Sequence, residues 1–158
     1  MRVTTTICAL LALMSIPTAA SAQAIEAQPL AGLRAFTIAI GDLDEEDEMS
    51  CGVTRTGLYT SLRAALNQSD MRITDNVQAR DGIIYLSVTL LSSCAAFISL
   101  EVKTTVKIEK SNARVVTPVW ERGRLRTGFT GKNAGAAIRE SVEETAKLLV
   151  TDWSSINK

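Results

Sequence analysis

Histidine is absent from this sequence of 158 residues. Without an imidazole, the chain has no Ser-His-Asp triad, no Cys-His pair and no histidine-ligated zinc site. Aromatic residues make up only 4% of the sequence, too few to line a sugar cleft between two catalytic carboxylates. The acidic residues gather instead in Asp42–Glu48 and on the polar side of the last predicted helix. The sequence therefore predicts a protein that is not an enzyme and that uses no cofactor.

A surplus of basic charge is absent as well. The full sequence carries 17 Lys and Arg against 17 Asp and Glu, a formal net charge of +0. Removal of Arg2 with the signal peptide described below leaves 16 basic residues against 17 acidic ones, a net charge of −1. Proteins that bind nucleic acids depend on a strong basic excess to neutralise phosphates. The composition therefore argues against a nucleic acid as the partner.

Long apolar runs are missing except near the first residue. Arg2 is followed by the apolar run Ile7–Ile16, and then by small residues that end in an Ala-x-Ala site at Ala22. A basic start, a short apolar core and such a site are typical of a secretory signal peptide. The run is shorter than the roughly 20 apolar residues that a membrane-spanning helix needs. We predict cleavage after Ala22, with a cut after Ala24 as the alternative.

The predicted signal peptide sets the organisation of the chain. It occupies residues 1–22, a short leader occupies 23–32, and 33–158 is one domain, large enough for a single core. No later segment is apolar enough to span a membrane, so the mature chain is predicted to lack a transmembrane segment. We expect a soluble exported protein, located in a periplasm or secreted, and not a lipoprotein.

Cysteine is scarce, and Cys8 lies within the signal peptide, which leaves Cys51 and Cys94. An isolated pair in an oxidising compartment favours a disulfide. Their spacing is not Cys-x-x-Cys, and no histidine is present to activate a thiolate. A structural disulfide closing this loop would stabilise the fold by about 4 kcal/mol in the chain-entropy model.

Two long strands within Gly82–Glu109 organise the domain. Apolar and polar side chains alternate along both, a period of two that is typical of half-buried antiparallel strands. The apolar face is formed by Ile84, Leu86, Val88, Leu90, Ile98, Leu100, Val102, Val106 and Ile108. The opposite face carries Ser87, Thr89, Glu101, Lys103, Thr105 and Lys107. The apolar face needs a cover, whereas the polar face can meet water or a partner.

Two amphipathic segments can supply that cover. Ser50–Ser69 and Asn133–Ile156 repeat apolar residues at helical spacing, as helices do when they lie on a sheet. Further strands are predicted at Leu33–Ile40, Met71–Val77 and Arg114–Arg122. The order β-α-β-β-β-β-α predicts an α+β two-layer sandwich, with an antiparallel sheet of about five strands and two helices on one face.

The strand Arg114–Arg122 contains Pro118, which cannot donate a hydrogen bond to a neighbouring strand. We therefore expect an edge strand or a strand with a bulge. Because of the proline, the sequence does not show on which face of the sheet Trp120 lies. Its side chain could belong to the core or to an interface. The helical spacing of Trp153 favours the core.

The acidic segment Asp42–Glu48 has two interpretations. Its carboxylates could bind calcium, a cation that prefers oxygen ligands. However, the glycine and the distal glutamate of an EF-hand loop are missing from this segment. We favour a solvated acidic loop and predict no metal site.

The basic segment that ends at Lys132 is the candidate binding site. It carries Arg122, Arg124 and Arg126, together with glycines, and it leads into the predicted last helix. Backbone N–H groups at such a place can bind a phosphate or carboxylate, although the P-loop sequence is absent. The alternatives are a solvated connection and contact with an acidic partner protein.

The arrangement of Leu33–Asp42, the helix to Asn67, the long hairpin and the ending from Val119 to Trp153 resembles the TolB amino-terminal and CsgG-like modules of envelope proteins. The resemblance implies a role in envelope assembly or binding. Our leading hypothesis is a non-catalytic, exported binding module whose partner is another envelope or secreted protein. A carrier of small anions that uses the loop at 123–132 and an inhibitor of a secreted hydrolase are the alternatives.

Overall fold

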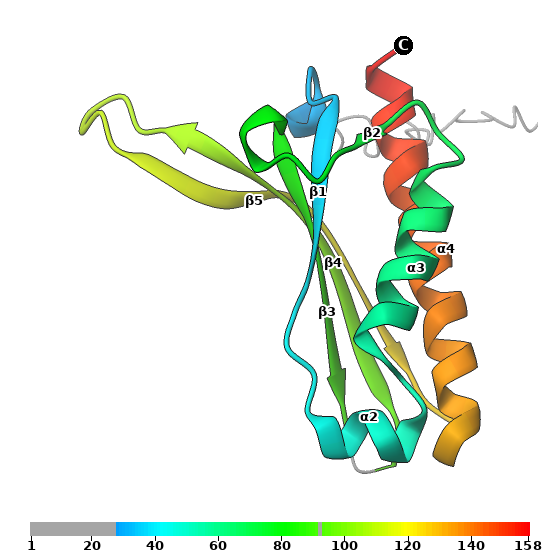
Figure 1. Cartoon of the computed structure of the whole chain (residues 1–158). Helices are drawn as coiled ribbons and strands as arrows, with labels where there is room; N and C mark the ends of the chain where they lie inside the picture. Colours follow the sequence, from blue (N-terminus) through cyan, green and yellow to red (C-terminus); the bar gives the residue numbers. More distant parts are fainter. Residues whose placement is uncertain (1–27, 92) are drawn as a thin grey trace, which may run out of the picture.

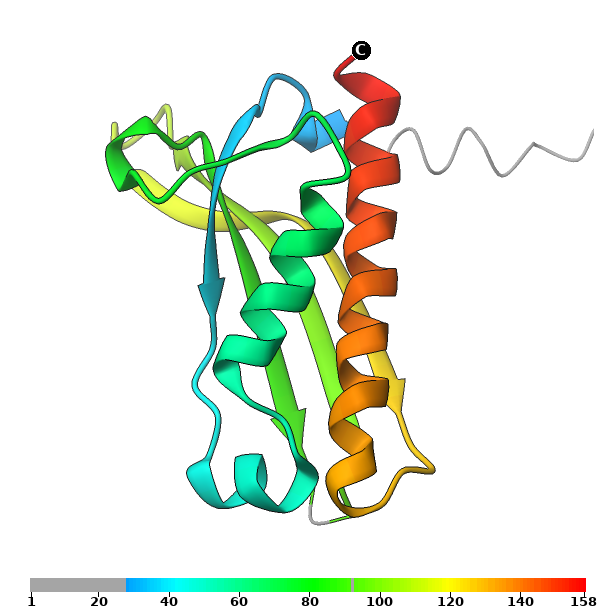
Figure 2. The same cartoon turned by 45° about the vertical axis from the view of Figure 1, so that its right-hand side comes forward.

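The computed structural model describes residues 28–91 and 93–158. The predicted signal peptide at 1–22 and the first part of the predicted leader lie outside these residues. The described residues form one sheet of five strands covered on one side by helices (Figures 1 and 2). The predicted α+β sandwich is therefore confirmed.

The strands are β1 (Ala35–Ile40), β2 (Arg72–Ile73), β3 (Gly82–Leu90), β4 (Ala96–Lys107) and β5 (Arg114–Arg126). Their order in the sheet is β2-β1-β3-β4-β5. β3, β4 and β5 are antiparallel, as predicted, but β1 runs parallel to both β2 and β3. The prediction of an entirely antiparallel sheet was wrong here, because the chain crosses over through helices before it returns beside β1. The sheet is mixed.

The helical layer contains α3 (Arg55–Leu66) and α4 (Ala134–Ile156), which lie side by side on one face of the sheet (Figure 2). A shorter helix, α2 (Glu45–Cys51), lies at the end of this layer. The described residues also form three short 3-10 helices: η1 (Gln28–Leu30), η2 (Val77–Ala79) and η3 (Gly131–Asn133).

The segment predicted as one helix, Ser50–Ser69, is divided between α2 and α3. Gly52 has a positive φ of 65°, and the Thr54 side chain accepts a hydrogen bond from the N–H of Gly57 at 3.0 Å, so α3 begins anew after the break. Most of the acidic segment predicted as a loop is helical, because the Asp44 carboxylate caps α2 by accepting from the N–H of Glu46 at 2.9 Å. The loop prediction was therefore wrong.

The core lies between the two layers. Leu58 and Leu62 of α3 and Ile138 and Leu149 of α4 are buried against the apolar side of β3 and β4. Both tryptophans belong to this core. The indole N–H of Trp153 donates to the carbonyl of Leu33 at 2.6 Å. The prediction of a core role for Trp153 is confirmed, and the question left open for Trp120 is answered in the same way.

The strand that contains Pro118 is an edge strand with a bulge, as predicted. The bulge lies where Val102 pairs with Trp120 and Lys103 pairs with Pro118, which leaves Val119 as the extra residue. Beyond it, β4 and β5 continue as an arm that projects away from the helices (Figure 1). β5 is longer than expected, because residues 123–126 extend the strand.

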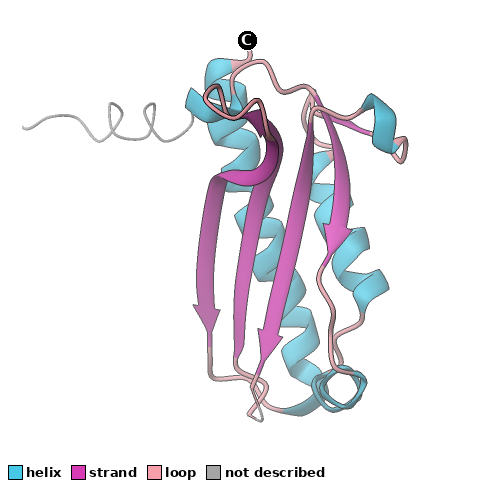
Figure 3. Ribbon diagram, turned by 90° about the vertical axis from the view of Figure 1, so that its left-hand side faces the viewer, coloured by secondary structure: helices cyan, strands magenta, loops and turns pink. Residues whose placement is uncertain are grey.

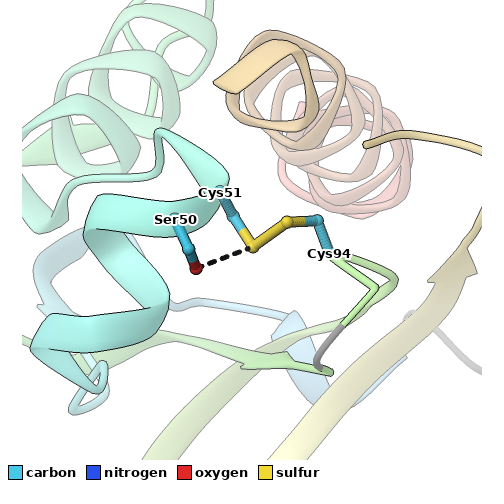
Figure 4. Close-up of a disulfide and its surroundings, with 3 residues drawn as sticks. All are labelled: Ser50, Cys51 and Cys94. Carbon is cyan, nitrogen blue, oxygen red and sulfur yellow. Dashed lines mark hydrogen bonds between the residues drawn. A yellow bond between two sulfur atoms is a disulfide. The ribbon is translucent and has the colours of Figure 1, made fainter. Parts of the chain in front are cut away.

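The disulfide joins Cys51 at the end of α2 to Cys94 in the turn between β3 and β4 (Figure 4). The Cα atoms lie 5.5 Å apart, and the predicted pairing is confirmed. The first turn of α4 packs against the same end of α2. A Cβ atom at Gly135 would collide with the carbonyl oxygen of Gly52.

Candidate interaction surfaces

The three arginines of the basic segment lie on the side of β5 that faces α4. Arg124 and Arg126 both form ion pairs with Glu144 of α4, at 2.6 Å in the case of Arg126. The Nε atom of Arg126 also donates to Ser141 at 2.6 Å. The acidic partner of these guanidinium groups is therefore a helix of the same chain. Lys132 lies in η3, and its side chain is outside the described residues.

Arg122 belongs to a buried polar cluster on the same side of β5. Asp152 of α4 is only 3% exposed. It accepts a hydrogen bond from the indole N–H of Trp120 at 2.9 Å and pairs with Arg122 at 3.5 Å. Removal of this carboxylate would take an acceptor from the buried indole N–H of Trp120 and an ion-pair partner from the partly exposed guanidinium of Arg122. This cluster binds β5 to α4 and is a structural feature.

The segment at 123–132, a candidate anion-binding loop, is a loop over only part of its length. Gly123 is part of β5, and a Cβ atom there would meet the ring of Phe97 at 2.9 Å. The glycine thus allows an aromatic ring to lie across the strand, a role in packing. The connection between β5 and η3 is limited to residues 127–130.

The other face of the sheet carries no helix among the described residues (Figure 3). Phe97 and Leu125 are directly paired across β4 and β5 on this open face, and their exposed fractions are 47% and 61%. A cross-strand pair of large apolar side chains is ordinarily buried. The pair forms an exposed apolar centre on this face.

Charged side chains lie further along the same face, beyond the Ser99–Gly123 pair that follows this apolar centre. Glu101 forms an ion pair with Lys103 at 2.9 Å, and the Lys103 ammonium lies 3.9 Å from the ring centroid of Tyr85. Glu121 pairs with Glu101 across the strands and accepts from Ser99 at 3.3 Å. The open face therefore combines exposed apolar groups with charged groups of both signs.

The sequence pattern indicates the polar members of this face but not Phe97 or Leu125. Phe97 shares the polar face of β4 with Ser99 and Glu101 in the alternating pattern. A large aromatic residue at such a position is a sequence signal for an exposed apolar site. Leu125 lies in the segment that was interpreted as a loop, so no strand period was assigned to it.

One carboxyl group outside these surfaces has a shifted pKa. Asp81 precedes β3 and accepts hydrogen bonds from the backbone N–H groups of Arg34 and Ala35, both at 2.8 Å. These two bonds are the main cause that lowers the pKa of Asp81 below its ordinary value of 3.8, and the charge of Arg72 acts in the same direction. The charged form of Asp81 thus fixes the start of β1.

The described residues contain no cluster of three or more His, Cys, Asp or Glu side chains arranged to hold a metal ion. No helix within residues 28–91 and 93–158 has the length and apolarity needed to cross a membrane.

Comparisons with known proteins give little further information. The sequence matches no known protein family and no curated protein. Among solved structures, the chain is similar to a minor lipoprotein from Acinetobacter baumannii, with a TM-score of 0.34 and 11% sequence identity. The aligned region covers 78% of this chain and 94% of the lipoprotein. A similarity of this size shows neither a common family nor a common function.

Proposed function

We propose that this protein is a non-catalytic, exported binding module that recognises another exported protein through the open face of its sheet. The observation that carries the proposal is the exposed pair of Phe97 and Leu125 on that face, near the start of β4 and the end of the edge strand β5. Exposed aromatic and aliphatic side chains surrounded by polar groups mark protein interaction sites. The disulfide and the predicted signal peptide support export.

The charges around the apolar centre indicate the chemistry of the partner. Glu101 and Glu121 lie on the same face, four residues along β4 and β5 from it, and the ammonium group of Lys103 is already paired with Glu101. The partner surface should therefore present an apolar centre with basic side chains at its rim. Arg122, Arg124 and Arg126 of β5 do not compete for this role, because they face α4.

Photocrosslinking tests the proposal. A photoreactive amino acid is placed at position 125 and, as the matched control, at position 148 of α4, where Leu148 is 41% exposed. Position 125 should give one dominant adduct with an exported protein in cells, and position 148 should not. Equal adducts from the two positions, or none from position 125, would contradict the proposal.

Substitution gives an independent measurement. Leu125→Asp should weaken the captured complex by about tenfold or more, a cost of roughly 1.4 kcal/mol, because a carboxylate would be buried against an apolar surface. Leu148→Asp should leave binding unchanged. Similar effects of both substitutions would show that the open face is not the contact.

A further inference from the structure

The outer edge of β1 is only partly covered. β2 pairs with Ala35 and Phe36, the first two residues of β1, whereas β3 on the other side pairs with β1 from Phe36 to Ile40. Beyond Phe36, no strand among the described residues lies against the outer edge (Figure 3). The second half of β1 is therefore an open sheet edge.

The hydrogen bonds on either side show which backbone groups face this edge. The carbonyl of Phe36 accepts from Thr74 at 2.9 Å on the β2 side, whereas the carbonyl of Ala35 accepts from Asp81 at 2.7 Å on the β3 side. Backbone groups two residues apart in a strand point to the same side. Those of Ile38 and Ile40 therefore point outward, away from β3.

Only one of these outward groups has a partner within the described part of the chain. The guanidinium of Arg55 donates to the carbonyl of Ile40 at 2.7 Å. The N–H groups of Ile38 and Ile40 and the carbonyl of Ile38 have none there. Unpaired donors and acceptors in a row are a template for an added strand.

Two surface hollows flank the open edge, one on each side of the sheet. The first, of about 410 Å³, lies on the helix side and is lined by Ala39, Ile40, Arg55, Thr56 and Tyr59. The second, of about 230 Å³, lies on the open side and is lined by Thr37, Ile38, Ala39, Thr74, Asp75, Val77, Arg80 and Ile83. Ala39 borders both.

We propose that the edge of β1 at Ile38–Ile40 binds an extended peptide segment of a partner protein as an added strand. Successive side chains of a strand point to opposite faces, so neighbouring residues of the peptide would enter the two hollows in turn. The first hollow accepts an aliphatic side chain against Ile40 and Tyr59. The second accepts a polar or acidic side chain near Arg80 and the hydroxyl groups of Thr37 and Thr74.

This site is separate from the open face around Phe97 and Leu125. β3 and part of β4 lie between the two surfaces in the strand order. The peptide site therefore goes beyond the proposed function, and Leu125→Asp should leave it unaffected.

Selection from a peptide library tests the inference. Random heptapeptides displayed on phage are selected on the full chain, expressed for export and purified with its disulfide intact. Enriched peptides should alternate aliphatic with polar or acidic residues. Their dissociation constants are then measured by fluorescence polarisation with wild type, Thr56→Trp, which fills the first hollow, and Ala64→Trp, an exposed control position on the same helix.

We expect Thr56→Trp to weaken binding by about tenfold or more and Ala64→Trp to change it by less than about twofold. A second measurement on the wild type is independent of any variant. Amide hydrogen exchange at Ile38 and Ile40 should slow by about tenfold or more when an enriched peptide is bound, since both N–H groups gain an acceptor.

Three results would overturn the inference. They are the absence of enriched peptides, equal binding to the two tryptophan variants, and binding that leaves the exchange of Ile38 and Ile40 unchanged. If Thr56→Trp fails to fold, the exchange measurement on the wild type decides alone.

Discussion

The two edges of this sheet, at β5 and at the second half of β1, differ in how well they are protected. At β5, the bulge, Pro118 and a row of arginines that pair with α4 occupy the edge strand. At β1, the described residues place one arginine, Arg55, on the last carbonyl of the edge beyond Phe36. Native proteins protect edge strands with prolines, bulges and charges. The comparison shows that β5 carries features in its own sequence that disfavour further pairing, whereas β1 carries none over Ile38–Ile40.

Removal of the disulfide should have the largest effect and should act mainly on the β1 side. The double substitution Cys51→Ser and Cys94→Ser should lower the free energy of unfolding by about 4 kcal/mol, because it releases a long loop in the unfolded chain. Urea unfolding measures the loss. Hydrogen exchange should accelerate in α2, at the end of β1 and in the first turn of α4, which packs against α2, more than in β5 and the rest of α4. Equal acceleration of hydrogen exchange throughout the molecule would contradict this prediction.

Loss of the buried carboxylate should have the next largest effect, on the β5 side. Asp152→Ala should destabilise the protein by about 2 to 3 kcal/mol, because the indole of Trp120 and the guanidinium of Arg122 lose a charged partner. Asp152→Asn keeps one oxygen acceptor and should cost less. Thermal unfolding of the two variants and the wild type checks the order. Equal losses would show that the carboxylate acts only by filling space.

The hydrogen bonds from the start of β1 to the Asp81 carboxylate should stabilise the fold in a pH-dependent way. Asp81→Asn should cost about 1 kcal/mol at neutral pH, because two backbone N–H groups lose a charged acceptor. Since folding lowers the pKa of this group, its stabilisation is present above the unfolded value of 3.8 and is lost as the pH falls through the lower folded value.

The difference in stability between wild type and Asp81→Asn should therefore shrink in acid. Urea unfolding of both proteins across the acidic range tests this dependence. Asp70→Asn changes an exposed carboxylate outside these hydrogen bonds and is the control. A difference that stays constant down to the lowest pH would contradict the assigned cause.

The half-exposed ion pairs of β5 should give the smallest effect. A double-mutant cycle with Arg126→Ala and Glu144→Ala should yield a coupling energy of about 0.5 to 1 kcal/mol, because solvent screens such pairs. The coupling should weaken in high salt. A coupling near zero would mean that these arginines are available to an outside partner, as the sequence-based hypothesis assumed.

The elements that depend on local periodicity could be predicted from the sequence. β3, β4 and α4 follow apolar periods of two or of helical spacing, and Pro118 correctly indicated an edge with a bulge. The parallel orientation of β1 could not be predicted in this way, because strand pairing across a helical crossover leaves no local pattern. The helix α2 was missed because a run of acidic residues has no apolar stripe.

The candidate site was harder to predict than the fold. Arg122, Arg124 and Arg126 were chosen for their charge, but their facing depends on the bulge at Val119, which shifts the alternation of β5. The open edge of β1 depends on where β2 stops. That limit follows from the path of the loop after Ile73 and not from any feature of β1 itself.

The contact between Gly135 and the carbonyl of Gly52 limits which residues can occupy position 135. Alanine is ordinarily the better residue within a helix by about 1 kcal/mol. Here, any side chain would push α4 away from the end of α2, next to Cys51. A saturation library at position 135 should therefore return glycine alone. A designer guided by helix propensity would make an error there.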